Sequence, residues 1–206
     1  MLKLVHTKFR FITLFLALTF LMAGCSLPVQ ESINPKVVQL FEIKEDVYTQ
    51  RNMFISTFGK HGEQYIDTTN YGNRVFIPVN TKVKLRDINF KKISFTYDGN
   101  LVILTNNVRY SKTTIEEVFW RYFGEQKVDL SKFTKLERNA INAGLLSDKT
   151  VPGMRKEAVL VSRGFPPAHK TSSLKADKWR YWQNQWDSVM ISFKDNNVTS
   201  INEVTQ

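Results

Sequence analysis

The sequence of 206 residues has a single cysteine, Cys25, and only three histidines. One cysteine excludes an internal disulfide framework and a cysteine-rich metal site. The two histidines beyond the first 25 residues, His61 and His169, are far apart and lack the spacing of metal ligands. The patterns G-x-S-x-G, H-E-x-x-H and the P-loop are also missing. These absences predict a non-enzymatic protein with no catalytic residues, no metal and no bound cofactor.

Long apolar runs are scarce as well. The uncharged run 11–22 is short for a bilayer span, which needs about 20 apolar residues. Three of the first ten residues are basic, and the small residues Ala23 and Gly24 follow the run. A basic start, a short apolar centre and small residues are typical of a secretory signal. We therefore predict that residues 1–24 form a signal peptide.

The string Leu21-Met22-Ala23-Gly24-Cys25 resembles the lipobox of bacterial lipoproteins. The resemblance implies cleavage after Gly24 and acyl chains on the Cys25 thiol and amino terminus. Two or more acyl chains hold a protein stably to a membrane, whereas one holds it marginally. Ser26 resembles an outer-membrane sorting signal, so we expect a lipid-anchored protein on the periplasmic face of the outer membrane. A soluble periplasmic protein with an incidental cysteine and an uncleaved anchor are the alternatives.

The chain is basic, with 29 Lys and Arg against 19 Asp and Glu and a formal charge of +10. Removal of residues 1–24 takes away three basic and no acidic residues, which leaves about +7. In the envelope, a basic surface meets phospholipid headgroups, lipopolysaccharide phosphates or acidic patches of other proteins. We expect the membrane and a protein as partners, and neither nucleic acid nor a small-molecule substrate.

Periodicity divides the mature chain into four segments and predicts an α+β fold. Residues 25–40 contain prolines without a clear period and are predicted to form a lipidated tether. Residues 41–110 are predicted to be a β-rich module, residues 111–147 a helical segment, and residues 148–206 an α+β module.

The clearest β signal is a hairpin. Residues 93–97 alternate apolar and polar, Asp98-Gly99 is a tight-turn pair, and residues 101–104 are apolar. Residues 81–88 also alternate, and Tyr71-Gly72-Asn73 is typical of a turn. The stretch 77–83 resembles the entry strand of small SH3-like barrels.

Three helices are predicted after residue 110. Thr113 and Glu116 have the spacing of a capping box, which starts the first helix. The second runs over residues 130–143. The third covers residues 154–163 and stops at Gly164.

The last third of the chain carries an ordered set of motifs: Gly153-Met154, a short helix, Gly164-Phe165-Pro166-Pro167, and Trp179-Arg180-Tyr181-Trp182. Together they resemble the BamE/SmpA/OmlA family of outer-membrane lipoproteins over about residues 150–204. The resemblance implies helices packed on a three-stranded antiparallel sheet. It also implies a role beside the machinery that assembles outer-membrane β-barrels.

Two groups of residues are candidates for binding. The partner-binding candidates are Phe165, His169, Trp182 and Trp186, because loops and exposed aromatic residues often carry interfaces. For Trp179, Tyr181 and Trp182, which cannot all face the same side of a strand, the alternative is a core on one strand face and a satellite cluster on the other. The anionic-surface candidates are Lys82, Lys84 and Arg86, which share one face of a predicted strand; an ordinary solvated face is the alternative.

The leading hypothesis is an outer-membrane protein-binding scaffold in barrel assembly or envelope integrity. One alternative is a binding module for lipopolysaccharide, phospholipid or peptidoglycan. The other is an inhibitor of a periplasmic enzyme, since a helix-on-sheet unit resembles the repeats of β-lactamase inhibitor proteins.

Overall fold

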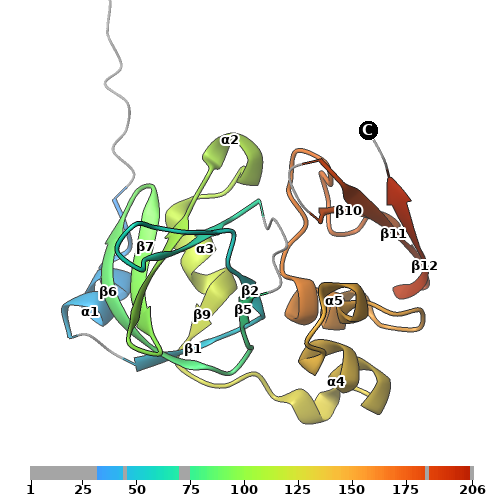
Figure 1. Ribbon diagram of the computed structural model, residues 1–206, viewed down its shortest axis with the longest axis horizontal. Helices are drawn as coiled ribbons and strands as arrows, with labels where there is room; N and C mark the ends of the chain where they lie inside the picture. The colour runs from blue at the N-terminus through green and yellow to red at the C-terminus, as the bar shows by residue number, and fades with distance from the viewer. Residues whose placement is uncertain (1–31, 44–45, 70–74, 184–185, 205–206) are drawn as a thin grey trace, which may run out of the picture. The chain divides into compact units, whose positions relative to one another are not determined.

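The computed structural model describes residues 32–43, 46–69, 75–183 and 186–204. Residues from Ser32 onward form one compact unit with mixed α+β structure, as the sequence predicted (Figure 1). The signal peptide, Cys25 and the predicted turn Tyr71-Gly72-Asn73 lie outside the described residues. Two hydrophobic cores define an N-terminal module, residues 32–124, and a C-terminal module, residues 130–204.

The N-terminal module is built on a seven-stranded mixed sheet. Its spatial order is β3 (Thr57–Phe58), β4 (Gln64–Asp67), β8 (Asn100–Thr105), β7 (Lys92–Tyr97), β6 (Lys82–Asn89), β1 (Asp46–Thr49) and β9 (Phe123–Gly124). Neighbours are antiparallel except β4 and β8, which are parallel. β2 (Met53–Phe54) and β5 (Phe76–Ile77) form a separate two-stranded ladder.

The predicted hairpin is confirmed as β7 and β8. Tyr97 pairs with Asn100 across the turn, and both turn residues, Asp98 and Gly99, have positive φ. A two-residue turn with left-handed residues matches the twist of a hairpin, and Asp-Gly is a favoured pair for it. The alternating strand predicted at residues 81–88 is β6.

Residues 35–40, predicted as part of the tether, are instead helical. Helix α1 (Pro35–Glu42) starts after Asn34, whose side chain accepts a hydrogen bond from the Lys36 amide at 2.9 Å. Val37, Leu40 and Phe41 have the spacing of one helix face, and all three are buried. This apolar face, the cap and a proline at the first helical position were available in the sequence.

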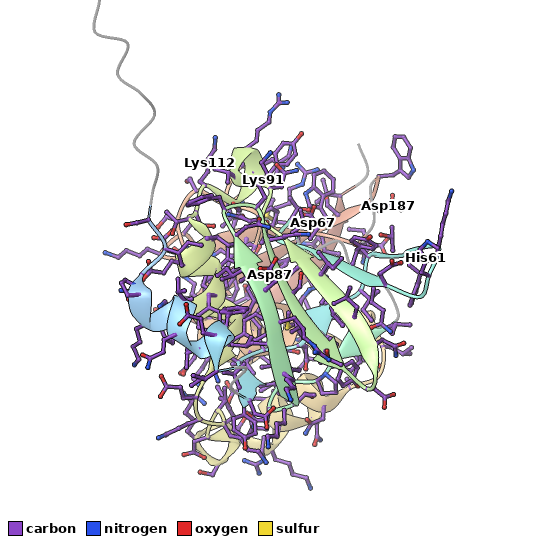
Figure 2. All side chains as sticks on the ribbon, turned by 90° about the vertical axis from the view of Figure 1, so that its left-hand side faces the viewer. His61, Asp67, Asp87, Lys91, Lys112 and Asp187 are labelled. Carbon is purple, nitrogen blue, oxygen red and sulfur yellow. The ribbon has the colours of Figure 1, made fainter. Side chains whose placement is uncertain are left out.

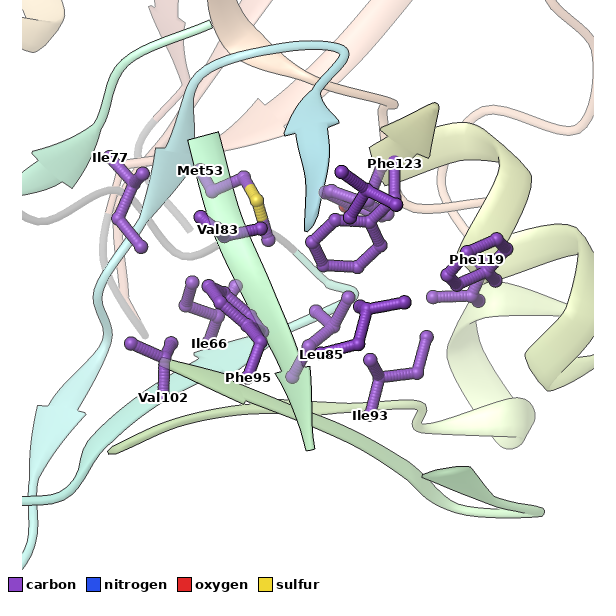
Figure 3. Packing of buried hydrophobic residues seen from close by; sticks show 14 of the residues in the cluster. Met53, Ile66, Ile77, Val83, Leu85, Ile93, Phe95, Val102, Phe119 and Phe123 are labelled. Atoms are coloured by element: carbon purple, nitrogen blue, oxygen red, sulfur yellow. The ribbon is translucent and has the colours of Figure 1, made fainter. Parts of the chain in front are cut away.

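Helix α3 (Ile115–Tyr122) and α1 pack in the same core as the large sheet. The Phe41 and Phe119 rings are 5.6 Å apart, and Phe123 lies 5.1 Å from Phe95 on the sheet (Figure 3). The capping box that starts α3 lies one residue later than predicted, on Thr114 and Glu117. The short helix α2 (Val108–Ser111) joins β8 to α3.

The C-terminal module packs helices against a three-stranded antiparallel sheet. Its elements are η1 (Leu130–Lys132), α4 (Lys135–Asn142), η2 (Leu146–Lys149), α5 (Lys156–Arg163), β10 (Lys178–Trp182), β11 (Ser188–Lys194) and β12 (Asn197–Val204). Ala140, Val159, Trp179 and Ile191 belong to its shared core. The helix predicted at 130–143 is divided, because Thr134 caps α4 with Glu137 after the η1 turn.

The predicted helical segment 111–147 does not stand as a unit of its own. Its first helix, α3, contributes to the core of the N-terminal module, and α4 contributes to the core of the C-terminal module. Residues 125–129 connect the two cores.

Candidate functional site

The two modules meet along a junction that is organised by Asn52, which follows β1. Asn52 is 1% exposed, and its Nδ2 donates to the carbonyls of Ile141 and Ser162 at 2.8 and 3.0 Å. Its Oδ1 accepts from the amide of Val79 at 2.9 Å, and its own amide donates to the carbonyl of Val161 at 2.9 Å. One side chain therefore satisfies backbone groups from α4, α5 and the N-terminal module.

Lys149 crosses the same junction. Its side chain is fully buried, with Nζ 2.8 Å from the Ile141 carbonyl and 3.7 Å from the centre of the Phe76 ring. Burial lowers the pKa of the Lys149 ammonium from 10.5 to about 8. The folded protein therefore binds this proton more weakly than the unfolded chain does.

We expect Lys149→Met to raise the free energy of unfolding at pH 7 by about 1–3 kcal/mol, because it removes a buried charge at nearly constant volume. The Ile141 carbonyl keeps its hydrogen bond from Asn52. The unfavourable contribution of Lys149 is complete below about pH 8 and fades as the pH rises towards 10.5, so the gain should shrink over that window. Urea unfolding at pH 7 and pH 10 measures it, with the exposed Lys135→Met as control; a less stable variant at pH 7 would contradict it.

At the centre of the junction, two arginines share one aromatic ring. The guanidinium carbons of Arg51 and Arg121 lie 4.3 and 4.6 Å from the centre of the half-buried Phe165 ring. Arg51 Nε donates to the Arg121 carbonyl, and burial lowers the pKa of Arg51 to about 10. Phe165, predicted as a partner contact, is thus one of the groups that join the modules.

An open groove of about 290 Å³ runs along one part of this junction. Its walls come from both modules and include Arg51, Trp120, Asp129, Lys132, Glu157 and Leu160. Trp120 is 40% exposed, and Lys132 forms an ion pair with Glu157 at 2.5 Å. The groove therefore offers an aromatic surface, apolar side chains and charges of both signs.

A smaller pocket lies beside Phe165 and shares none of the residues that line the groove. It is lined in part by Thr68, Ser111, Thr113 and Arg121, and it has room for about 10 Å³. Asn106 holds this region together: its Nδ2 donates to the Thr113 carbonyl at 2.9 Å, and its Oδ1 accepts from Ser111 Oγ at 2.7 Å. The lining therefore combines three hydroxyl side chains and one arginine with apolar and aromatic side chains, among them Val118 and Pro166.

The other predicted partner-binding residues are not brought together as one exposed patch. Trp182 is only 7% exposed, because it faces away from the Trp179 core and is covered by the loop after α5. Its ring stacks on His169 at 6.3 Å, and Lys170 and Arg180 approach it at 5.7 and 5.6 Å. This is the satellite cluster. Trp186, in contrast, is 70% exposed.

The predicted anionic-surface residues are exposed on β6 but have local acidic and polar neighbours. Lys82 forms an ion pair with Asp46 at 2.8 Å, and that hydrogen bond holds the pKa of the Asp46 carboxyl below its usual value. Arg86 Nε donates to Thr96 Oγ1 at 2.6 Å. The same strand also carries the exposed Asp87, beside a register shift between Leu85 and Asp87 (Figure 2). Lys84 is exposed between these groups.

In the described part of the chain, no three His, Cys, Asp or Glu side chains are placed to hold a metal ion. Among the same residues, no helix has both the length and the apolar character that a bilayer span requires.

Comparisons with protein-family models, with curated proteins and with solved structures found no match to this chain.

The sequence did not predict a role for the polar residues of the junction. Asn52, Arg51 and Arg121 belong to no motif, because their hydrogen-bond partners are 27 to 110 residues away in the chain. Trp120 did carry a signal: it lies off the apolar face of α3 formed by Val118, Phe119 and Tyr122. Tryptophan is enriched among interface hot spots, so a tryptophan on the polar face of an amphipathic helix is a candidate binding residue.

Proposed function

We propose that this chain is an outer-membrane lipoprotein that binds a protein partner from the periplasmic face and acts as a scaffold, without catalysing a reaction. The partner belongs to the machinery that assembles β-barrels or maintains the envelope. Acyl chains on Cys25 confine the protein to the membrane surface, which raises its effective concentration near partners there. The lipobox-like string 21–25 and the family-like motifs at residues 150–204 support the location and the class of partner.

The observation that carries the proposal is the groove across the junction. Tryptophan and arginine are the residue types that dominate interface hot spots, and Trp120 and Arg51 both line it. Leu160 and Val161 supply apolar contact area, and Asp129 adds a charge at the rim. Because both modules contribute walls, the groove exists only in the folded, two-module protein.

Photocrosslinking in cells tests the proposal. A photoreactive phenylalanine analogue at position 120 should give a discrete crosslinked species with an envelope protein. The same analogue at Phe90, a 44% exposed apolar residue of the N-terminal module outside the groove, is the matched control. Cys25→Ala should release the protein from the membrane fraction and weaken the crosslink.

Mass spectrometry of the mature protein supplies the second readout, because acylation of Cys25 increases the mass of its peptide by the mass of the attached lipid. An unmodified thiol at Cys25 would contradict the proposed lipid anchor. If positions 120 and 90 gave identical crosslinks, or if position 120 gave none, the groove would not be the surface on which the partner docks.

A further inference from the structure

The small pocket beside Phe165 contains a buried hydroxyl without a hydrogen-bond partner. Thr113 is 8% exposed, and its Oγ1 has no partner in the described structure. The neighbouring Ser111 hydroxyl is already committed to Asn106. A buried hydroxyl that lacks a partner is costly, so an acceptor that reaches it gains a hydrogen bond from a donor that has already lost its water.

Positive charge borders the same pocket. Arg121 lines it and forms no ion pair with any residue that the structure describes. Arg51 lies against the same Phe165 ring as Arg121, so two like charges are held close together. An anion bound beside Arg121 would relieve this repulsion, which is stronger near the protein interior than in water.

More cations lie close in the chain to the residues that line the pocket. Lys112 directly follows Ser111, and Lys170 lies two residues after the lining residue Ala168; both are exposed. Lys91 lies at the same end of the N-terminal module as Lys112 (Figure 2), where its carbonyl accepts from the Asn106 amide at 2.7 Å. Burial, and then Lys170, lower the pKa of His169, which agrees with a positive surrounding.

One carboxylate lies nearby and opposes an anion. Asp67 precedes the lining residue Thr68, but its Oδ1 accepts two hydrogen bonds from Thr69, from the amide and the hydroxyl, both at 2.7 Å. These bonds stabilise its charge locally and leave Arg121 unpaired. The balance of named charges at the pocket remains positive.

We infer that this pocket binds a phosphate-type oxyanion, with one oxygen accepting from the Thr113 hydroxyl and Arg121 facing the negative charge. A volume of about 10 Å³ admits one oxygen atom, so the rest of the group stays at the mouth of the pocket. Hydrogen bonds between a guanidinium and phosphate are among the strongest that proteins form. Free phosphate and the phosphate of a lipid headgroup share this chemistry. The site does not depend on the protein-binding groove.

Calorimetric titration of the full mature protein in nonionic detergent, at constant ionic strength, tests the inference. The probes are inorganic phosphate, glycerol 3-phosphate and a short-chain phosphatidylglycerol. Arg121→Gln and the nearly isosteric Thr113→Val should each weaken binding by about tenfold or more. Lys194→Gln, which removes an exposed cation from β11, is the matched charge control and should change binding by less than about twofold. Asp67→Asn should tighten it.

The three probes separate the sources of the phosphate. Tighter binding of the two esters indicates a headgroup, whereas tighter binding of inorganic phosphate indicates the free ion; either supports the site. Absence of saturable binding, equal binding by wild type and Thr113→Val, or only a water molecule in the pocket at saturating phosphate would overturn it. If Arg121→Gln fails to fold, Thr113→Val still tests whether the Thr113 hydroxyl contributes to anion binding.

Discussion

Replacing Glu137 with Ala is expected to lower the free energy of unfolding by about 2–4 kcal/mol at pH 7, because two backbone amides and the half-exposed Arg155 guanidinium lose a buried acceptor. The Glu137 side chain is 1% exposed and accepts from Arg155 Nη2 at 2.7 Å and from Arg155 Nε at 2.9 Å. It also accepts from the backbone amides of Arg155 and Thr134 at 2.9 and 2.8 Å. One carboxylate therefore accepts hydrogen bonds from the backbone amides of the two residues that precede α4 and α5. The side chain of Arg155 makes no capping hydrogen bond to α5.

The effect should depend on pH. The hydrogen bonds from Arg155 lower the pKa of Glu137 from 4.5 to about 2. Its stabilising contribution is complete above pH 4.5 and is lost as the pH falls towards 2. Urea unfolding of wild type and variant should therefore show a difference that narrows over this window.

Glu157→Ala is the matched control, because it removes a carboxylate of the same helix layer that is about half exposed in its pair with Lys132. It should cost no more than about 1 kcal/mol. Equal losses for the two variants at pH 7 would show that burial of Glu137 does not determine its contribution.

Asn52→Ala is expected to lower the free energy of unfolding by about 2–4 kcal/mol, since a buried group left without its partner costs about 1–3 kcal/mol. The substitution leaves the Val79 amide and the Ser162 carbonyl without the hydrogen bonds that Asn52 makes to them. The Ile141 carbonyl is protected by Lys149. The loss should appear as a lower midpoint in urea with an unchanged slope.

Asn52→Asp separates hydrogen bonding from shape. It keeps the acceptor for Val79 but places carboxylate oxygen against the carbonyls of Ile141 and Ser162. We expect it to be less stable than Asn52→Ala at pH 7 and to recover progressively as the pH falls towards about 4, because burial raises the pKa of this carboxyl and the folded protein takes up the proton before the unfolded chain does. The exposed Asn139→Ala of α4 is the control and should change stability by less than about 0.5 kcal/mol. Wild-type stability of Asn52→Asp at pH 7 would contradict this account of the junction.

The C-terminal module illustrates how far local patterns reach. The Gly164 stop, the alternation of β11 and the opposite faces of Trp179 and Trp182 agree with the structure, because each depends on a few neighbouring residues. Neighbouring residues alone did not predict that Trp182 is buried. A loop residue, His169, covers it, and the path of that loop depends on the packing of the whole module.

The α1 helix illustrates a different miss. Its cap and its apolar face were present in the sequence, yet two prolines in residues 26–40 favoured a tether. Pro35 occupies the first turn, where a proline has no hydrogen bond to lose, so it begins the helix and does not break it.

The sequence by itself determined the α+β class, the β7–β8 hairpin, the approximate helices and the lipobox-like string, since these depend on periodicity, turn chemistry and short motifs. The tertiary structure decided the junction, the groove with Trp120, the small pocket with Thr113 and the burial of Lys149. These features depend on side chains that meet backbone groups far away in the chain, and one-dimensional patterns carry no record of which distant groups become neighbours or lose their water.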